Sequence, residues 1–419
     1  MDIKCAYLNG VLDEEVYMCQ PNGYEAPGKE TWVWKLKKAL YGLKQGGCEW
    51  YAVIDNFFIH ELGFTHTHAN HCIYIFQCTD SVIIIPIYVD DLMLGYQKEA
   101  DMIWVCTKLK KHFEMVDLGD LTWVVGMQVR YDLERGQITV DQSQYLQKVL
   151  AQFGMHESNA VSTPLPEKLV LCAATDTEVE EVWEFPYLET IGSLMYAMMG
   201  TCPDIAYAIS TLSRFATCPG SQHISTMKHL FHKGMTHLGI TFSQDGGELT
   251  AYSDSDYAAD PSTHKSISGA IFTLAGGPIS WSSKEQTLIS LSTTEVEYVA
   301  TAKACKEIIW FLHRLLHELG QGPTNPTNLF IDNHGTLLLA KNPMNHSHTK
   351  HIDVWHHFIQ QCIAMKSVDA QQIPTANNPT DICTKSLGKQ KIWHFRNLIG
   401  LSHVHLQFNL GGTWGEGAC

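Results

Sequence analysis

The sequence of 419 residues is 45% hydrophobic, which allows roughly two or three folded domains with sizeable cores. Its formal net charge of −15 argues against tight, non-specific binding to nucleic acid, because phosphate contacts require Lys and Arg. The sequence shows neither an apolar run of ~20 residues nor a secretory signal pattern, and its thirteen cysteines include no CxxC pair, so we expect no membrane span and no disulfide framework.

Short β-rich runs and amphipathic helices are mixed over the first 160 residues. The apolar runs "VIIIPIYV" (82–89) and "LTWVVGMQVRY" (121–131) predict strands. Apolar residues at helical spacing predict helices over "ADMIWVCTKLKKHFEMV" (100–116) and "SQYLQKVLAQFGM" (143–155). This region is therefore expected to form an α+β domain.

The pattern changes twice in the remaining sequence. Residues 161–181 are rich in Pro and Thr and then acidic, which predicts a linker, and residues 186–239 have helical spacing. From about residue 249, two strand patterns, a long helical pattern and the strand pattern "TNLFIDNHG" follow in order. This order predicts a compact α/β domain with a mixed sheet. The end, "GGTWGEGAC", is expected to be disordered.

Two adjacent acids, Asp90 and Asp91, stand between apolar runs in "IIIPIYVDDLMLG". Because side chains alternate faces along a strand, the pair fits best at a turn between two strands, where at least one acid faces a common site. Clustered acids repel unless a divalent cation neutralises them, and oxygen ligands favour Mg²⁺ or Mn²⁺ over zinc. From the dipeptide alone, a polar hairpin tip in solvent is the favoured interpretation.

The segments "MDIKCAYLNGVLDEEVYMCQPNGY", "KLKKALYGLKQ" and "IYVDD" occur in this order and together resemble the reverse transcriptase of copia-type retrotransposons. The resemblance implies that Asp2, Asp90 and Asp91 hold two Mg²⁺ (or Mn²⁺) ions, with Asp2 and Asp90 as the principal ligands. These ions would serve the attack of a primer 3′-hydroxyl on a nucleoside triphosphate. Tyr7 matches the aromatic residue that excludes a 2′-hydroxyl. Gly42 and Gln45 match the loop that contacts the templating base and the incoming nucleotide.

Two features depart from the family pattern. The sequence begins one residue before Asp2, so the fingers region that precedes this motif in the family is expected to be missing. In addition, "GGCEWY" follows "LYGLKQ", where the family usually has a Pro and an Arg. We therefore expect the polymerase site to be recognisable but weak or inactive.

Four acidic contexts resemble the blocks of the ribonuclease H domain that follows reverse transcriptase in the same elements: "YSDSDYAAD", "STTEVEYVATAKA", "LFIDNHG" and "NNPTDICTK". The resemblance implies that two Mg²⁺ ions are held for cutting the RNA strand of an RNA–DNA hybrid. The implied ligands are Asp254, Glu297, Asp332 and Asp381. Asp256 and Glu295 remain alternatives for the first two, and surface acids at the ends of strands and helices remain the alternative for the whole set.

Histidines gather in two further segments. "HSHTKHIDVWHHF" (346–358) matches the block before the last acid, and His351 is the expected proton shuttle. "HTHANHC" offers His66, His68, His71 and Cys72, but their spacing is too tight for a usual zinc site. We therefore do not expect zinc there.

The resemblance implies a multidomain α+β and α/β fold. The expected domains are a reverse transcriptase palm, N-terminally truncated, over 1–160, a linker with a helical thumb or connection over 161–245, a ribonuclease H-like mixed sheet with helices over 246–390, and a tail over 391–419.

The leading functional hypothesis is an RNA-directed DNA polymerase with ribonuclease H from a copia-type retrotransposon. Its partners would be an RNA template, a DNA primer, RNA–DNA hybrid, nucleoside triphosphates and other parts of the retrotransposon polyprotein, with no membrane. It would lie in the cytoplasm, in a virus-like particle, with the nucleus as the alternative. One rival is an inactive nucleic-acid-binding relic of a decayed element. The other is a structural or interaction module that keeps the fold alone.

Overall fold

A computed structural model describes residues 1–404, except for 79, 160, 176, 178–184, 232–235, 261–262 and 342–352. The chain divides into two compact units. The first contains Met1–Val125 and Phe311–Gly322, and the second contains Gly126–Trp310 and Pro323–Cys419. No helix in the described part of the chain is both long enough and apolar enough to cross a bilayer.

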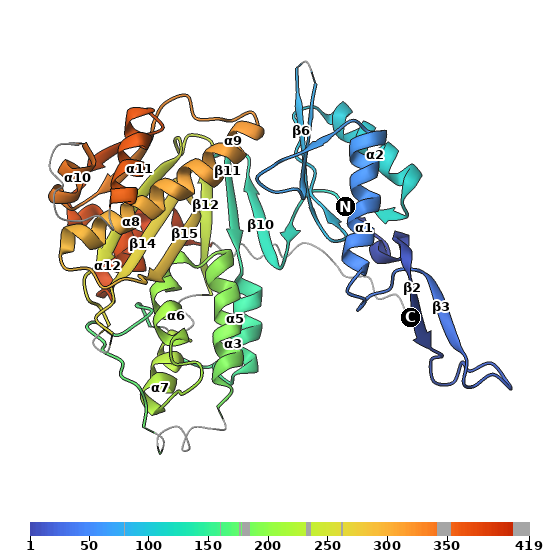
Figure 1. Ribbon diagram of the computed structural model, residues 1–419, viewed down its shortest axis with the longest axis horizontal. Helices are drawn as coiled ribbons and strands as arrows, with labels where there is room; N and C mark the ends of the chain where they lie inside the picture. Colours follow the sequence, from blue (N-terminus) through green and yellow to red (C-terminus); the bar gives the residue numbers. More distant parts are fainter. Residues whose placement is uncertain are drawn as a thin grey trace. The chain divides into compact units, whose positions relative to one another are not determined.

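A six-stranded antiparallel sheet forms the centre of the first unit, in the order β4-β5-β6-β7-β1-β8. Its strands are β1 (Asp2–Ile3), β4 (Thr65–His66), β5 (Ile73–Gln77), β6 (Val82–Tyr88), β7 (Asp91–Leu92) and β8 (Met115–Val116). Helices α1 (Gly46–Asn56), which continues as a π-helix over Phe57–Glu61, and α2 (Glu99–His112) pack against this sheet (Figure 1). Ile83 and Ile85 on β6 are fully buried while Ile84 is not, as the alternation of a strand requires.

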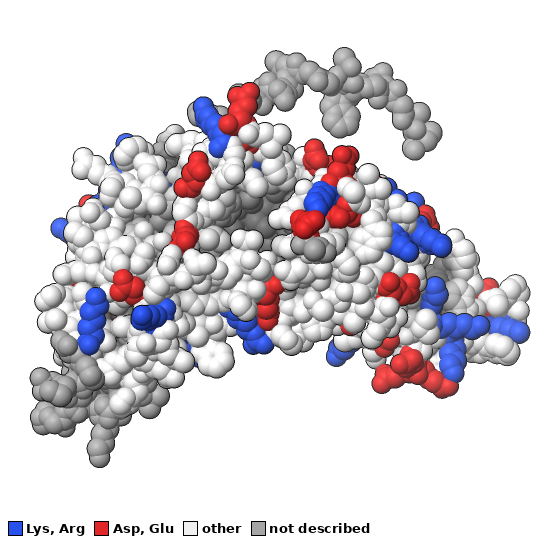
Figure 2. Space-filling view, turned by 90° about the horizontal axis from the view of Figure 1, so that it is seen from above, with Lys and Arg blue, Asp and Glu red and all other residues white. Residues whose placement is uncertain are grey.

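A separate two-stranded ribbon, β2 (Val11–Cys19) and β3 (Val33–Lys38), belongs to the first unit. Most of its side chains are exposed. Figure 2 shows lysine and arginine side chains of the described residues interspersed with acidic ones on the drawn face.

Helices fill one part of the second unit. They are α3 (Ser143–Gln152), α5 (Tyr187–Gly200), α6 (Ala206–Ser213) and α7 (Ser221–Leu230). Their apolar faces share one core, and the helical pattern predicted for 186–239 is confirmed as far as Leu230, where α7 ends. The described part of the predicted linker, 161–175, has neither helix nor strand, but its Leu165 and Leu171 are buried in this core. These two leucines thus anchor the segment to the helical core.

A mixed five-stranded sheet, with the order β15-β14-β13-β16-β17, confirms the mixed sheet predicted for the C-terminal region. Strands β13, β14 and β15 are antiparallel neighbours, while β16 runs parallel to both β13 and β17. The strands are β13 (Thr250–Asp256), β14 (Ile267–Leu274), β15 (Gly277–Glu285), β16 (Thr327–Ile331) and β17 (Val368–Gln372). Helix α8 (Thr293–Glu307) packs on β13 and β14, and α10 (His334–Lys341) and α11 (Asp353–Ala364) lie beside it (Figure 1).

A second antiparallel sheet joins distant parts of the sequence. Strand β11 (Gln137–Asp141) lies between β10 (Met127–Asp132) and β12 (Leu238–Ser243), and β12 also pairs with β18 (Leu401–His403). Helix α12 (Lys389–Leu398) precedes β18, so the expected tail is folded up to this strand, and "GGTWGEGAC" lies outside the described residues. Through this sheet, residues 127–141 belong to the second unit. The palm domain expected from the sequence includes these residues, because it extends to residue 160. The expected domain division stays a prediction.

Two predicted elements differ in detail from those observed. The strand predicted over 121–131 is interrupted, because Val125 and Gly126 have φ angles of 44° and 70° and turn the chain before β10. The helix predicted over 100–116 ends at His112, and its last two residues form β8, which pairs with β1. Strand β6 and helix α3 lie where they were predicted.

Candidate metal centre and the paired-acid turn

Three carboxylates converge at the edge of the mixed sheet. Asp254 lies on β13, Asp332 follows the last residue of β16, and Glu297 projects from α8. One carboxylate oxygen from each lies within 4.8 Å of the others, and no other group of three potential metal ligands among the described residues meets this criterion. The convergence follows from topology, because β13 and β16 are parallel neighbours with Ser253 paired to Ile331, so the next residue of each strand is an acid at the same edge.

The start of α8 explains why Glu297, and not Glu295, is the member of this group. The Ser292 side chain caps the helix by accepting a hydrogen bond from the Glu295 backbone N–H. In return, Glu295 Oε2 accepts one from the Leu291 N–H at 2.8 Å. This reciprocal cap occupies Glu295 at the helix end. Glu297 lies further along α8, buried against the sheet.

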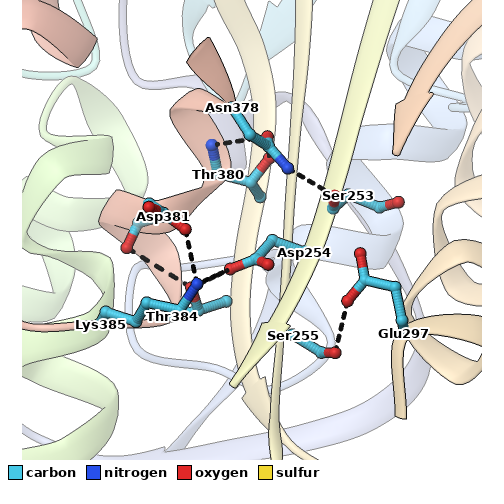
Figure 3. A network of polar contacts seen from close by, with 9 residues as sticks. All are labelled: Ser253, Asp254, Ser255, Glu297, Asn378, Thr380, Asp381, Thr384 and Lys385. Atoms are coloured by element: carbon cyan, nitrogen blue, oxygen red, sulfur yellow. Dashed lines mark hydrogen bonds and ion pairs between the residues drawn. The ribbon is translucent and has the colours of Figure 1, made fainter. Parts of the chain in front are cut away.

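A second layer of polar side chains surrounds Asp254 (Figure 3). The Lys385 ammonium lies 3.1 Å from Asp254 Oδ2 and 2.7 Å from Asp381 Oδ1, and the Thr384 hydroxyl donates to Asp254 Oδ2. Asp381 belongs to the 3₁₀ helix η7 (Pro379–Cys383), at whose N-terminus Asn378 donates from Nδ2 to the Ser253 carbonyl at 3.0 Å. Asp381 is thus connected to the three-acid group through Lys385 and is not itself part of that group.

Burial dominates the electrostatics of this site. It raises the pKa of Asp254 to about 7, against the opposing effect of the Lys385 charge. It also raises the pKa of Glu297 well above its usual range, and the neighbouring Asp254 raises it further. Burial lowers the pKa of Lys385, but the charges of Asp254 and Asp381 outweigh this and raise it above its ordinary value. The site therefore concentrates carboxylates, and among the described residues the Lys385 ammonium is the cation that contacts them.

The orientation of Glu297 fits a divalent cation. Its Oε2 accepts a hydrogen bond from the Ser255 hydroxyl at 2.5 Å, whereas its buried Oε1 has no hydrogen-bond partner among the described residues. A buried, unpartnered carboxylate oxygen is costly unless a cation binds it. Three carboxylates offer the oxygen ligands that Mg²⁺ and Mn²⁺ prefer.

The acid pair in the first unit occupies the predicted turn between two strands. Tyr88 on β6 pairs with Asp91 on β7, so Val89 and Asp90 form the turn, and Val89 has a φ of 58°. Asp2 on β1 is the direct cross-strand partner of Asp91. The three acids, all among the residues that the structure describes, therefore lie at one end of the sheet, but they do not form a group with one oxygen from each within 4.8 Å of the others. Burial first, then the charges of Asp90 and Asp2, raise the pKa of Asp91.

Aromatic residues support this turn. The Trp50 indole N–H, on α1, donates to the Val89 carbonyl at 2.6 Å. Tyr7 packs on Tyr41 with ring centroids 4.7 Å apart. A largely apolar cavity of about 230 Å³ lies beside the turn and is lined by Tyr7, Gly47, Trp50, Tyr51, Ile54, Cys72, Tyr74, Ile87 and Val89.

The remaining predicted site residues lie in the following places. Gly42 is in a loop with a φ of 92°, a conformation that favours glycine, and Gln45 precedes α1, with Nε2 3.4 Å from Glu14 Oε2. The unusual "GGCEWY" forms the first turns of α1. His351 lies outside the described residues. The rings of His66 and His71 lie 4.5 Å apart, but these histidines form no metal-ligand group within the described part of the chain.

Sequence reasoning missed Thr384, Lys385 and Asn378. All three lie within the segment "NNPTDICTK" (377–385), which also contains Asp381. The signal that could have identified Lys385 is its position four residues after an acid, a spacing that allows an ion pair on a helix. That spacing is common on surfaces, so it does not indicate burial.

Comparison with known proteins places this chain among retrotransposon sequences. The family model described as "Reverse transcriptase (RNA-dependent DNA polymerase)" matches residues 1–167. The chain is 37% identical over 408 residues to the "Retrovirus-related Pol polyprotein from transposon TNT 1-94" of Nicotiana tabacum, covering 96% of this chain and 30% of that protein. It is 32% identical to the corresponding protein from transposon RE1 of Arabidopsis thaliana, covering 96% of this chain and 27% of the relative. The chain thus spans less than a third of the length of these relatives.

Among solved structures, a similar chain is the N-terminal RNase H domain of rv2228c from Mycobacterium tuberculosis, fused to maltose-binding protein. It is 11% identical, covers 33% of this chain and 90% of that chain, and has a TM-score of 0.26.

Proposed function

Since this chain belongs to the Pol polyproteins of copia-type retrotransposons, we propose that its second unit is a ribonuclease H that cuts the RNA strand of RNA–DNA hybrids with Mg²⁺ or Mn²⁺. The observation that carries this proposal is the convergence of Asp254, Glu297 and Asp332, with a buried Glu297 oxygen left unpartnered. These acids come from three separate elements and meet at one edge of the sheet. Unrelated surface acids at the ends of strands and helices have no reason to converge in this way.

The chain's own residues have separable roles in this proposal. Asp254, Glu297 and Asp332 would hold one divalent ion, and Asp381, across the shared Asp254, would contribute to holding a second. When bound, such ions generate a nucleophilic hydroxide from water and stabilise charge on the scissile phosphate. Ser255 fixes the orientation of Glu297 through its hydrogen bond, and Thr384 does the same for Asp254. His351 remains the proposed proton shuttle.

Cleavage of a hybrid tests this proposal. The purified chain, given an end-labelled RNA strand annealed to DNA in Mg²⁺ buffer, should release shorter RNA. Asp332→Asn should abolish release, because it removes one carboxylate ligand. Asp245→Asn, at an exposed loop position, is the matched control and should cleave like the parent. Intact RNA after incubation with the parent chain in both Mg²⁺ and Mn²⁺ would favour the rival proposal of a nucleic-acid-binding relic.

RNA-directed DNA synthesis by the first unit is a second candidate function, favoured by the direct pairing of Asp2 with Asp91 beside Asp90. In this proposal the three acids hold two ions, Tyr7 excludes a 2′-hydroxyl, and Gly42 and Gln45 contact template and nucleotide. The partners would be an RNA template, a DNA primer and nucleoside triphosphates, in a cytoplasmic particle or in the nucleus. Extension of a DNA primer on an RNA template is the test. Asp90→Asn should remove any extension, and extension that survives this change would exclude the turn as the site.

A further inference from the structure

Lys385 places a positive charge inside the candidate metal centre. Its Nζ lies between two buried carboxylates, 3.1 Å from Asp254 Oδ2 and 2.7 Å from Asp381 Oδ1 (Figure 3). The exposed fractions of these two acid side chains are 3% and 2%, so water screens the three charges poorly. The ammonium is therefore the cation that neutralises this side of the site.

Asp254 divides the site into two cation positions. On one side, its carboxylate joins those of Glu297 and Asp332, where Glu297 Oε1 is buried without a partner among the described residues. On the other side, Asp254 faces Asp381, and there the ammonium of Lys385 already makes both contacts. One position therefore has no cation from the described residues, and the other is filled by the Lys385 ammonium.

Lys385 also has a route out of this position. Its side chain is 31% exposed, whereas the two acids that it contacts are almost fully buried. A flexible lysine stem allows the ammonium to move toward solvent without a change in the backbone. The acids, held by β13 and η7, have no comparable freedom.

We propose that the Lys385 ammonium occupies the second cation position, between Asp254 and Asp381, and that a divalent ion enters it only when Nζ withdraws. This inference rests on the proposed function in one respect, because both require a divalent ion at the three-acid position. The resting site is then a one-ion site, and Lys385 sets the concentration at which the second ion binds. Lys385 acts here as a positioning residue for the acids in the ion-free protein.

Calorimetric titration of the full chain with Mn²⁺ tests this competition, in a background that carries Asp2→Asn and Asp90→Asn so that ions at the paired-acid turn do not contribute to the binding steps. Lys385→Met removes the charge and keeps an unbranched side chain, and Lys389→Met, at an exposed position on α12, is the matched control. The parent and Lys389→Met should bind one ion tightly and a second more weakly. Lys385→Met should bind the second ion about fivefold more tightly or better, the low end of typical coupling between sites. Unchanged or weaker second-ion binding in Lys385→Met, with native circular dichroism, overturns the proposal.

A measurement on the parent chain avoids the risk that the variant fails to fold. By thermodynamic reciprocity, if Lys385 weakens binding of the second ion by a given factor, the bound ion must weaken the contact of the Lys385 ammonium with Asp254 and Asp381 by the same factor. Acetylation of Lys385, followed by mass spectrometry, should therefore rise by about fivefold at saturating Mn²⁺, while acetylation of Lys389 stays constant. Constant Lys385 labelling overturns the proposal.

The two proposals fail in different ways. Normal two-step Mn²⁺ binding with the predicted Lys385 effects, but without hybrid cleavage, contradicts the ribonuclease function and leaves the Lys385 inference standing. Absence of Mn²⁺ binding by parent and variant alike contradicts the Lys385 inference. Hybrid cleavage together with equal second-ion affinity in both chains contradicts the Lys385 inference alone.

Discussion

Asp2 and Asp91 face each other directly across strands β1 and β7, in a position without hydrogen bonds between the two residues, because the flanking bonds are Leu92 N to Met1 O and Ile3 N to Asp90 O. In antiparallel sheets, such non-hydrogen-bonded pairs bring side chains closest together. Two like charges at this position destabilise the sheet unless a cation lies between them. The strands thus hold together two groups that repel each other.

We predict that Asp2→Asn stabilises the first unit in the absence of divalent ions. The change removes a charge that raises the pKa of Asp91, and relief of a direct like-charge pair is worth about 0.5 kcal/mol. In Mn²⁺, the variant should gain less stability than the parent, because a ligand is lost. Thermal unfolding with chelator and with Mn²⁺ measures both effects. Asp13→Asn, on the exposed ribbon, should change neither, and an equal Mn²⁺ gain in Asp2→Asn would argue against an ion at the turn.

The stability of the second unit should fall as pH rises when no ion is present. The pKa of Asp254 is raised from 3.8 to about 7, so the folded state binds more protons than the unfolded state within this interval. Unfolding free energy therefore decreases as pH rises from about 4 to 7, by an amount on the order of a few kcal/mol. Hydrogen exchange of the β13 amides at pH 5 and pH 8 in chelator, corrected for intrinsic rates, measures this. Asp254→Asn should reduce the difference, and a pH-independent opening free energy in the parent would contradict the prediction.

Replacement of Trp50 by Phe should loosen the paired-acid turn. The indole N–H holds the carbonyl of Val89, a β-branched residue at a φ of 58° where such residues are strained. Loss of this hydrogen bond should cost about 1 kcal/mol, while the phenyl ring keeps most of the packing. Thermal unfolding of the first unit and exchange of the Asp91 amide measure the change. Trp34→Phe on the exposed ribbon is the control, and an Asp91 amide equally protected in Trp50→Phe would refute the support role of the indole.

Gly269→Ala should disturb the candidate metal centre by displacing the η7 segment that lies next to Asp254. Gly269 pairs with Asp254 across β13 and β14, and a Cβ there would lie 2.6 Å from Thr384 Cγ2 and 3.0 Å from Cys383 Cβ. The η7 segment must shift, which moves Thr384 and Lys385 away from Asp254. We expect lower stability, by about 1–3 kcal/mol, and slower hybrid cleavage. Gly192→Ala in α5, where a Cβ meets no atom within 4 Å, should stabilise by about 0.5–1 kcal/mol and cleave normally.

Breaking the Arg396–Asp204 pair should destabilise the second unit strongly. Arg396 Nε donates to Asp204 Oδ2 at 2.8 Å, and Asp204, in the 3₁₀ turn Pro203–Ile205, is buried, so Asp204→Ala leaves an uncompensated guanidinium. The expected cost is about 3 kcal/mol. Asp132→Ala, which breaks the exposed pair with Arg135, should cost less than about 1 kcal/mol. Urea unfolding compares the two, and similar costs would contradict the difference in burial.

The sequence predicted those parts of the molecule in which apolar residues recur at regular spacing or in which a recognisable motif occurs. Strand β6, the turn at Asp90 and Asp91, helix α3 and the mixed sheet all followed from apolar spacing or from acids placed between apolar runs. The expectation that Asp254, Glu297 and Asp332 form one site came from their contexts, and the structure brings these three together. Their assignment as ligands remains a prediction.

Other features have no periodic signal. Leu165 and Leu171 are buried in a segment without helix or strand, and nothing in the spacing of an irregular segment distinguishes anchored leucines from exposed ones. The same holds for Lys385, because a lysine four residues beyond an acid usually lies on a surface. Strand β18 lies within the expected tail, where three residues are too few for a pattern and pairing with β12 decides the conformation.

The pairing of β11 with β12 determines where this polypeptide can be divided for separate expression. A cut at residue 160, between the expected palm and the linker, would remove β10 and β11 and leave the whole edge of β12 unpaired. Exposed edges of this kind promote intermolecular pairing and aggregation. A recombinant second unit should therefore begin before Met127, and a version that begins at the linker should accumulate in inclusion bodies.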